Sequence, residues 1–173
     1  KAFEWFRING VQANFGFQID QLSLMMILII TGIGTLIHLY SIGYMSHDKG
    51  FYKFFVYLNL FIFSMLLLVM GSNYLILFIG WEGVGVCSYL LIGFWFQNWE
   101  YGKAARKAFI MNRIGDLGLL IGIFLIANET NALDYLSVAN NASKFAVDSP
   151  IILFICASLF IGAVGKSAQV PLY

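Results

Sequence analysis

Four strongly ionisable residues lie inside apolar stretches of this sequence: Glu82, Arg113, Asp116 and Lys166. A charge at the centre of a bilayer costs at least about 2.5–3.5 kcal/mol, so intramembrane acids and bases are usually functional. Glu82 and Lys166 are an acid and a base on different apolar stretches, the chemistry needed to pass a proton. An ion pair at about 4 Å gains about 4 kcal/mol at an effective dielectric constant near 20, so protonating or moving Glu82 would weaken the hold of Lys166 on its proton.

Each of these residues also has a structural explanation. Glu82 and Lys166 could simply neutralise each other and hold two helices together. Arg113 and Asp116 are three residues apart on one helical face, so their simplest description is an intrahelical ion pair. His38 is a candidate proton relay, because histidine changes its charge near neutral pH. A histidine at a helix end that faces lipid headgroups explains His38 equally well.

Membrane-spanning helices must position these residues. The 173 residues are 60% hydrophobic and 11% charged, whereas soluble proteins have about 25% charged residues. A span takes about 20 mostly apolar residues. We therefore predict an all-α, polytopic membrane helix bundle that forms one transmembrane domain over 1–173. The predicted transmembrane helices, about five in number, cover 22–44, 54–70, 74–96, 104–127 and 151–173.

Local signals refine this bundle. Residues 71–73 form a turn so short that the helices on either side must be antiparallel neighbours. Pro171 follows Lys166 by five residues and lacks a backbone N–H, so the last helix should kink or break near Pro171. Glycines at two places should allow helices to approach closely. These glycines are Gly118, Gly122, Gly162 and Gly165.

Basic residues in the loops predict the orientation. The loops after the first and third helices carry Lys49, Lys53, Lys103, Arg106 and Lys107. The opposite side carries Lys1, Arg7 and Lys144, and its stretch 128–150, with Asp134 and Asp148, should hold a short surface helix. By the positive-inside rule the more basic loops face the cytoplasm or its equivalent, and the N-terminal stretch lies outside.

Several function classes are disfavoured. A net charge of +1 gives no basic field for nucleic acid. Cys87 and Cys156 sit singly in apolar runs, so they are expected to be core thiols rather than a disulfide or metal ligands. The sequence has no P-loop and no dinucleotide-binding motif after a strand. We expect no cofactor-binding or metal site in this chain.

Four sequence blocks carry a family resemblance: QIDQLSLMM at 18–26, FIGWEGVGVCSYLLIGFW at 78–95, KAFIMNRIGDLG at 107–118 and GAVGKSAQVPLY at 162–173. With these blocks the chain resembles, over essentially its whole length, the antiporter-like chain 5 or L subunit family of respiratory NADH:quinone oxidoreductase, complex I. The resemblance implies that Glu82 is the family's key intramembrane glutamate, Lys166 its partner lysine on a broken helix, and Asp116 a further acid of the proton path. It also implies that the five helices are the third to seventh of a longer subunit.

The resemblance further implies a proton-translocating subunit of an enzyme complex, without a redox site of its own. NADH, FMN, iron–sulfur clusters and quinone are expected in other membrane and peripheral subunits, which with the lipid bilayer are the expected partners. A bacterial plasma membrane is the preferred location over a mitochondrial inner membrane. The first alternative is a large subunit of a multisubunit sodium/proton antiporter or related ion pump, and the second is a scaffold whose buried charges only lock helices together.

Overall fold

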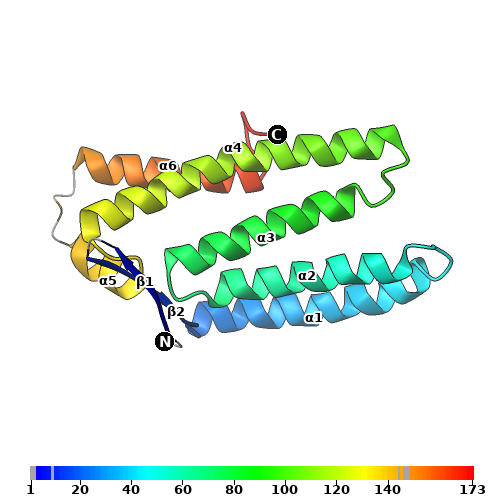
Figure 1. Ribbon diagram of the computed structural model, residues 1–173, viewed down its shortest axis with the longest axis horizontal. Helices are drawn as coiled ribbons and strands as arrows, with labels where there is room; N and C mark the ends of the chain where they lie inside the picture. Colours follow the sequence, from blue (N-terminus) through cyan, green and yellow to red (C-terminus); the bar gives the residue numbers. More distant parts are fainter. Residues whose placement is uncertain (1–2, 9, 144, 146–148) are drawn as a thin grey trace. The chain divides into compact units, whose positions relative to one another are not determined.

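The structure is a computed structural model that describes residues 3–8, 10–143, 145 and 149–173. Lys1, Lys144 and Asp148, which entered the comparison of loop charges, lie outside the described residues. The elements in chain order are β1 (Phe3–Ile8), β2 (Val11–Phe15), α1 (Gln21–Tyr44), α2 (Phe51–Met70), α3 (Tyr74–Ile92), α4 (Trp99–Thr130), α5 (Tyr135–Ala142) and α6 (Pro150–Lys166) (Figure 1).

The chain divides into two compact units. Unit 1 comprises residues 1–17, 71–78 and 110–173, and unit 2 comprises residues 18–70 and 79–109. Unit 1 thus holds the two strands, α5, α6 and most of α4, whereas unit 2 holds α1, α2 and most of α3.

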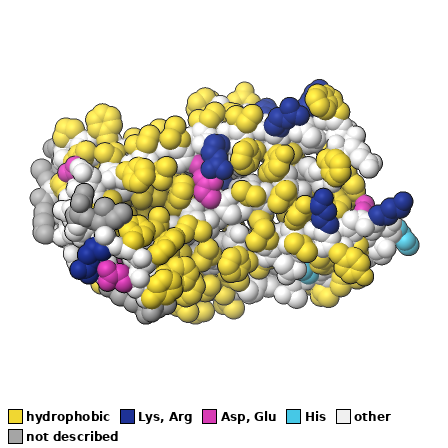
Figure 2. All heavy atoms as spheres, viewed as in Figure 1, with side chains coloured by type: hydrophobic (Ala, Val, Ile, Leu, Met, Phe, Trp, Pro, Cys, Tyr) yellow, Lys and Arg dark blue, Asp and Glu magenta, His cyan; other side chains and the backbone are white. Residues whose placement is uncertain are grey.

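The structure confirms the predicted bundle of apolar helices. It departs from an all-α fold only in the hairpin of β1 and β2, among the described residues. Among the described residues, four helices, α1 to α4, are long and apolar enough to cross a membrane. Their large apolar side chains stay exposed, such as Leu22 at 71% and Leu36 at 66% in α1. Hydrophobic side chains cover much of the face in Figure 2. Such exposure suits lipid as the surrounding solvent.

Several helix bounds differ from the ranges predicted for the spans. Helix α2 begins at Phe51 rather than 54, α3 ends at Ile92 rather than 96, and α4 ends at Thr130 rather than 127. The largest differences are at the start of α4 and the end of α6. Helix α4 begins at Trp99, before the predicted 104, because Asn98 accepts a hydrogen bond from the Glu100 N–H (3.0 Å) and starts the helix among polar residues that hydropathy cannot mark as helical. Helix α6 ends at Lys166 rather than at Tyr173. After α6 the backbone of Ala168 has a φ of 50°, in the left-handed region, which an α-helix cannot continue through.

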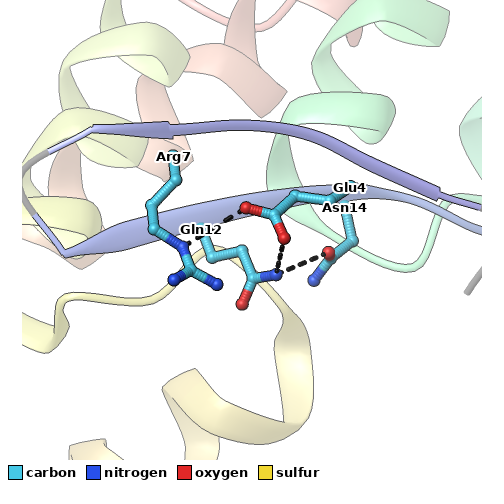
Figure 3. Close-up of polar contacts among 4 residues, drawn as sticks. All are labelled: Glu4, Arg7, Gln12 and Asn14. Carbon is cyan, nitrogen blue, oxygen red and sulfur yellow. Dashed lines mark hydrogen bonds and ion pairs between the residues drawn. The ribbon is translucent and has the colours of Figure 1, made fainter.

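Sequence analysis missed a β-hairpin at the start of the chain. Strands β1 and β2 pair antiparallel, with Phe3 opposite Phe15 and Arg7 opposite Gln12. On this hairpin the Glu4 carboxylate contacts Arg7 Nε at 3.3 Å and accepts a hydrogen bond from Gln12 Nε2 at 2.9 Å (Figure 3). Gln12 also donates to Asn14 Oδ1 at 3.2 Å. The Glu4–Arg7 and Glu4–Gln12 contacts are exposed, and the predicted outer location of this N-terminal stretch stays a prediction.

Asn73 joins the hairpin to the helices of unit 1. Its side chain is 2% exposed, donates to the carbonyl oxygen of Asn14 (2.6 Å) and accepts from the Ile76 N–H (2.9 Å), which caps the start of α3. Tyr135 of α5 donates its hydroxyl to the Asn73 carbonyl (3.3 Å). Helix α5, the surface helix expected within 128–150, begins where the Asp134 carboxylate accepts from the Ser137 N–H (3.1 Å).

Close approach of α4 and α6 organises the rest of unit 1. A Cβ atom added at Gly115 would lie 2.9 Å from the Gly165 Cα, and one added at Gly162 would lie 2.8 Å from the Leu119 Cβ. Gly118 and Gly122 face Ile161 and Leu159 in the same way. The predicted glycine faces are therefore confirmed, with Gly115 as an additional member.

Unit 2 is also held by small residues. A Cβ added at Gly34 of α1 would meet Ile62 of α2 at 2.9 Å, and one added at Gly83 of α3 would meet the Ser64 Oγ at 2.6 Å. Gly80 lies against the backbone of Leu68. Helices α2 and α3 thus pack as close neighbours, as the short turn at 71–73 predicts.

Replacing Asn73 by Ala should lower the free energy of unfolding by about 1–3 kcal/mol, because the substitution leaves the Ile76 N–H and the Asn14 carbonyl without their partner. The thermal unfolding midpoint of the assembled protein measures the loss. Asn140→Ala on α5 is the matched control, since Asn140 is exposed. Equal midpoints for both variants would contradict the role given to Asn73.

Gly115→Ala should lower stability by about 1–3 kcal/mol, because the new methyl group has to push α6 away. Gly102→Ala on the same helix is the control, since a Cβ atom there meets no described atom within 4 Å. The amount of folded protein recovered from membranes and its thermal midpoint report the difference. A Gly115 variant as stable as the Gly102 variant would show that the close approach is not required.

Candidate functional site

The buried charges of unit 1 meet beside the closest contact of its helices. Gly115 precedes Asp116 in α4, and Gly165 precedes Lys166 in α6, so the approach of the two glycines brings the next two side chains together. Lys166 Nζ lies 3.9 Å from Asp116 Oδ1. Sequence analysis paired Asp116 with Arg113 and Lys166 with Glu82, and did not anticipate this contact.

The Asp116–Lys166 pair is shielded but not tightly bonded. The Asp116 side chain is 5% exposed and the Lys166 side chain 18% exposed. A separation of 3.9 Å permits Coulombic attraction, although it exceeds the length of a hydrogen bond. At this separation the contact between the two atoms is electrostatic rather than a direct hydrogen bond.

Lys166 is also the last residue of a short apolar helix. Helix α6 has 17 residues, so it is about 25 Å long, less than the roughly 30 Å of a bilayer core. The Ser167 N–H still bonds to the Ala163 carbonyl (3.0 Å), and no helix continues through the described residues after Lys166. The positive charge therefore lies at the negative end of the helix dipole, which stabilises the ammonium group. The prediction of a last helix broken near Pro171 agrees with this end.

Glu82 belongs to unit 2 and lies between two close helix contacts. It is half-buried in α3, after Gly80, which faces Leu68, and before Gly83, which faces Ser64 of α2. Ser64 is 4% exposed and donates its hydroxyl to the Leu60 carbonyl (2.9 Å). Packing on both sides thus restricts the backbone that carries Glu82. The pairing of Glu82 with Lys166 stays a prediction.

His38 points one ring nitrogen at its own helix. Its Nδ1 lies 2.7 Å from the Gly34 carbonyl oxygen, which can only accept, so Nδ1 carries the proton and donates. The other ring nitrogen, Nε2, is buried with no hydrogen-bond partner among the described residues. The His38 ring, Thr31, Thr35 and Ile62 border a hollow of about 290 Å³ in unit 2. His38 therefore places a buried ring nitrogen in α1, the predicted first span.

Two of the other residues considered in the sequence, Arg113 and Cys156, are exposed. Arg113 is exposed on α4, whereas Asp116 is buried, and their predicted ion pair stays a prediction. Cys87 is buried as expected, but Cys156 is exposed on α6, so the expectation of a core thiol is wrong for Cys156. In the described parts of the chain, no three His, Cys, Asp or Glu side chains are grouped so that they could hold a metal ion.

Long apolar helices that carry an acid and a base near the end of a short helix are features of a polytopic membrane protein. The comparisons are more specific. Residues 71–173 match the family described as "NADH:quinone oxidoreductase/Mrp antiporter, TM", and residues 5–55 match the one described as "NADH-Ubiquinone oxidoreductase (complex I), chain 5 N-terminus". The chain belongs to the complex I chain 5 branch of this antiporter-like family.

Relatives with closely similar sequences have consistent names. The chain is 54% identical to NADH-quinone oxidoreductase subunit L of Campylobacter jejuni over 171 residues, which are 99% of this chain and 28% of that protein. It is 46% identical to NADH-ubiquinone oxidoreductase chain 5 of Metridium senile over 173 residues, which are 100% of this chain and 28% of that protein. The chain thus spans little more than a quarter of these relatives.

A solved structure shows the same fold. The Mrp complex from a Dietzia species matches with a TM-score of 0.80 at 24% identity, over 99% of this chain and 18% of that one. Both kinds of comparison therefore support an integral, multi-pass membrane protein with the antiporter-like helix arrangement.

Asp116→Leu alone should destabilise the protein more than Asp116→Leu combined with Lys166→Met. Removing one member of a buried ion pair takes away part of the electrostatic compensation of the other, at a cost of up to about 3–5 kcal/mol, whereas removing both avoids much of that cost. Thermal unfolding of the single and double variants measures the coupling. The control is the pair Glu100 and Lys103 at 3.2 Å on α4, whose side chains are 72% and 54% exposed and should couple weakly. A coupling no larger at Asp116 than at Glu100 would contradict the pairing.

Proposed function

We propose that this chain is part of a proton-translocating membrane subunit of an NADH:quinone oxidoreductase. NADH oxidation and quinone reduction take place in partner subunits that carry FMN and the iron–sulfur clusters, and this chain contributes to the proton path without a redox site. The observation that carries the proposal is the shielded Asp116–Lys166 pair at the end of α6. A bacterial plasma membrane is the proposed location, and the loops that carry Lys49, Lys53 and Lys103 face the cytoplasm.

Lys166 is the proposed proton carrier, and Asp116 and Glu82 set its charge. With Asp116 ionised, the ammonium form of Lys166 is favoured; as negative charge near it is withdrawn, burial favours the neutral amine. Lys166 then releases one proton to the next acceptor and later takes up another, so the net change over a cycle is one proton moved. Glu82 is the acid proposed to supply or withdraw that charge as it is protonated or displaced. His38 and Arg113 are proposed as auxiliary relay groups.

Changing Glu82→Gln should lower the number of protons pumped per NADH oxidised, or stop turnover where the steps are obligatorily coupled, because Gln cannot ionise. The measurement uses sealed vesicles that contain the whole complex, after confirmation that the variant assembles. Glu100→Gln is the matched control, since Glu100 is a solvent-exposed acid at the start of α4. If the Glu82 variant assembles, turns over and pumps normally, Glu82 is not in the path.

The alternative is a large subunit of a multisubunit sodium/proton antiporter, which the Mrp fold similarity favours. The two functions differ in what drives the proton. An antiporter subunit would need sodium to move protons. It would not need an NADH-oxidising partner. Proton pumping that depends on NADH oxidation and is unchanged when potassium replaces sodium would decide for the oxidoreductase.

A further inference from the structure

Two adjoining hollows lie among basic and aromatic residues of unit 2, and their linings do not include Glu82, Asp116 or Lys166. The first has a volume of about 380 Å³ and is bordered by His47, Lys49 and Lys53 together with Trp95 and Phe96. It lies where the loop before α2 meets the end of α3. Its lining combines cationic side chains with large rings, the composition of a membrane–water interface.

The second hollow continues from the first into an apolar surrounding. Its volume is about 190 Å³, and it shares Lys53 and Phe96 with the first hollow. Its other walls include Tyr57 of α2 and Tyr89 and Leu90 of α3. A ligand that fills both hollows needs an anionic group at one end and a hydrocarbon chain at the other.

The lysines of the first hollow are available for an anion. Both are exposed, and among the described residues neither makes an ion pair. Lys53 Nζ lies 5.7 Å from the ring centre of Tyr57 and 5.6 Å from that of Phe96, so the two rings hold the ammonium group at the junction of the hollows. By contrast, Lys103 is paired with Glu100 at 3.2 Å.

Asp48 is the acidic residue that lines the first hollow, and its carboxylate already accepts two hydrogen bonds. Its carboxylate accepts from Trp95 Nε1 at 2.8 Å and from the Gly50 N–H at 2.6 Å. These hydrogen bonds hold the pKa of Asp48 below its usual value, and the bond from Trp95 has the larger effect. The Asp48 carboxylate therefore remains an anion at neutral pH. Asp48 holds Trp95 against the loop through its hydrogen bond. Lys49 and Lys53 carry two positive charges against the single negative charge of Asp48, so the hollow keeps a net positive charge.

We propose that the two hollows bind one anionic phospholipid. Its phosphodiester lies at Lys49 and Lys53, and one acyl chain runs along Tyr57, Tyr89 and Leu90. Charge complementarity selects an anionic headgroup over a zwitterionic one, which would bring a second cation towards the lysines. A small anion such as phosphate would leave the apolar hollow unused. The residues that line the hollows are not those proposed for the proton path, so either proposal can fail alone.

The test uses the complete complex in bilayer nanodiscs with photoactivatable lipids. Phosphatidylglycerol and phosphatidylcholine carry the same diazirine-bearing acyl chain, and labelled peptides are mapped by mass spectrometry. We expect phosphatidylglycerol to label the segments around Tyr57 and Leu90 in preference to phosphatidylcholine. Each lysine near an anionic surface contributes about a fivefold change in binding, so Lys49→Gln with Lys53→Gln should weaken labelling about 30-fold. Lys103→Gln, the control, should leave it unchanged.

Other results overturn the proposal. Equal labelling by the two lipids would mean a nonspecific lipid contact, and labelling that survives the double substitution would mean that the lysines do not bind the headgroup. Loss of labelling in excess inorganic phosphate would indicate a small-anion site instead. Absence of labelling at these segments while other parts of the complex are labelled would mean that another subunit covers the hollows.

Discussion

The contact between Gly115 and Gly165 is the constraint on which the candidate site depends. Only a missing side chain on both helices allows α4 and α6 to approach so closely, since a Cβ atom on either glycine would lie under 3.0 Å from the other backbone. The same approach shields Asp116 and Lys166, the residues that follow the glycines in sequence. Helix packing and the burial of charge are therefore one feature. In lipid, where hydrophobic attraction between helices is absent, packing of this kind supplies much of the association.

The second unit repeats this arrangement around its own acid. Glu82 lies between Gly80 and Gly83, which contact Leu68 and Ser64 of α2. Each of the three proposed proton-path residues thus stands next to a glycine against which a neighbouring helix packs. A charge in the membrane needs an environment that does not relax around it freely, because a mobile surrounding would allow lipid or water to replace the intended partner. The close helix contacts at the glycines restrict the backbone beside each of these charges.

The sequence predicted the helices better than the contacts between them. Apolar runs of sufficient length marked α1 to α3 and much of α4, because lipid demands a property that hydropathy measures directly. Hydropathy did not mark the first turns of α4 as helical, because they contain polar residues such as Glu100 and Lys103. The hairpin was not predicted either. The dipeptide Asn9-Gly10, between two short segments in which apolar and polar residues alternate, is nevertheless a recognised hairpin-turn signal.

The candidate site was predicted only by residue type. Glu82, Asp116 and Lys166 stood out because a charge inside an apolar run is costly, and this argument needs no structure. Their partners could not be derived in the same way. Asp116 and Lys166 are fifty residues apart, and their contact depends on which glycines of α4 and α6 face each other. Arg113 is the nearest opposite charge to Asp116 in sequence, and spacing alone therefore favoured it.

The central claim is that Lys166 carries protons rather than a fixed charge, and replacing it by Arg tests this most directly. Arginine keeps the positive charge beside Asp116 but does not release its proton in proteins. The measurement is the number of protons pumped per NADH oxidised by the whole complex in sealed vesicles, with Lys166→Met for comparison. We predict that Lys166→Arg assembles and yet pumps as poorly as Lys166→Met. Normal pumping by the Arg variant would show that the charge only locks α4 to α6, and would contradict the account.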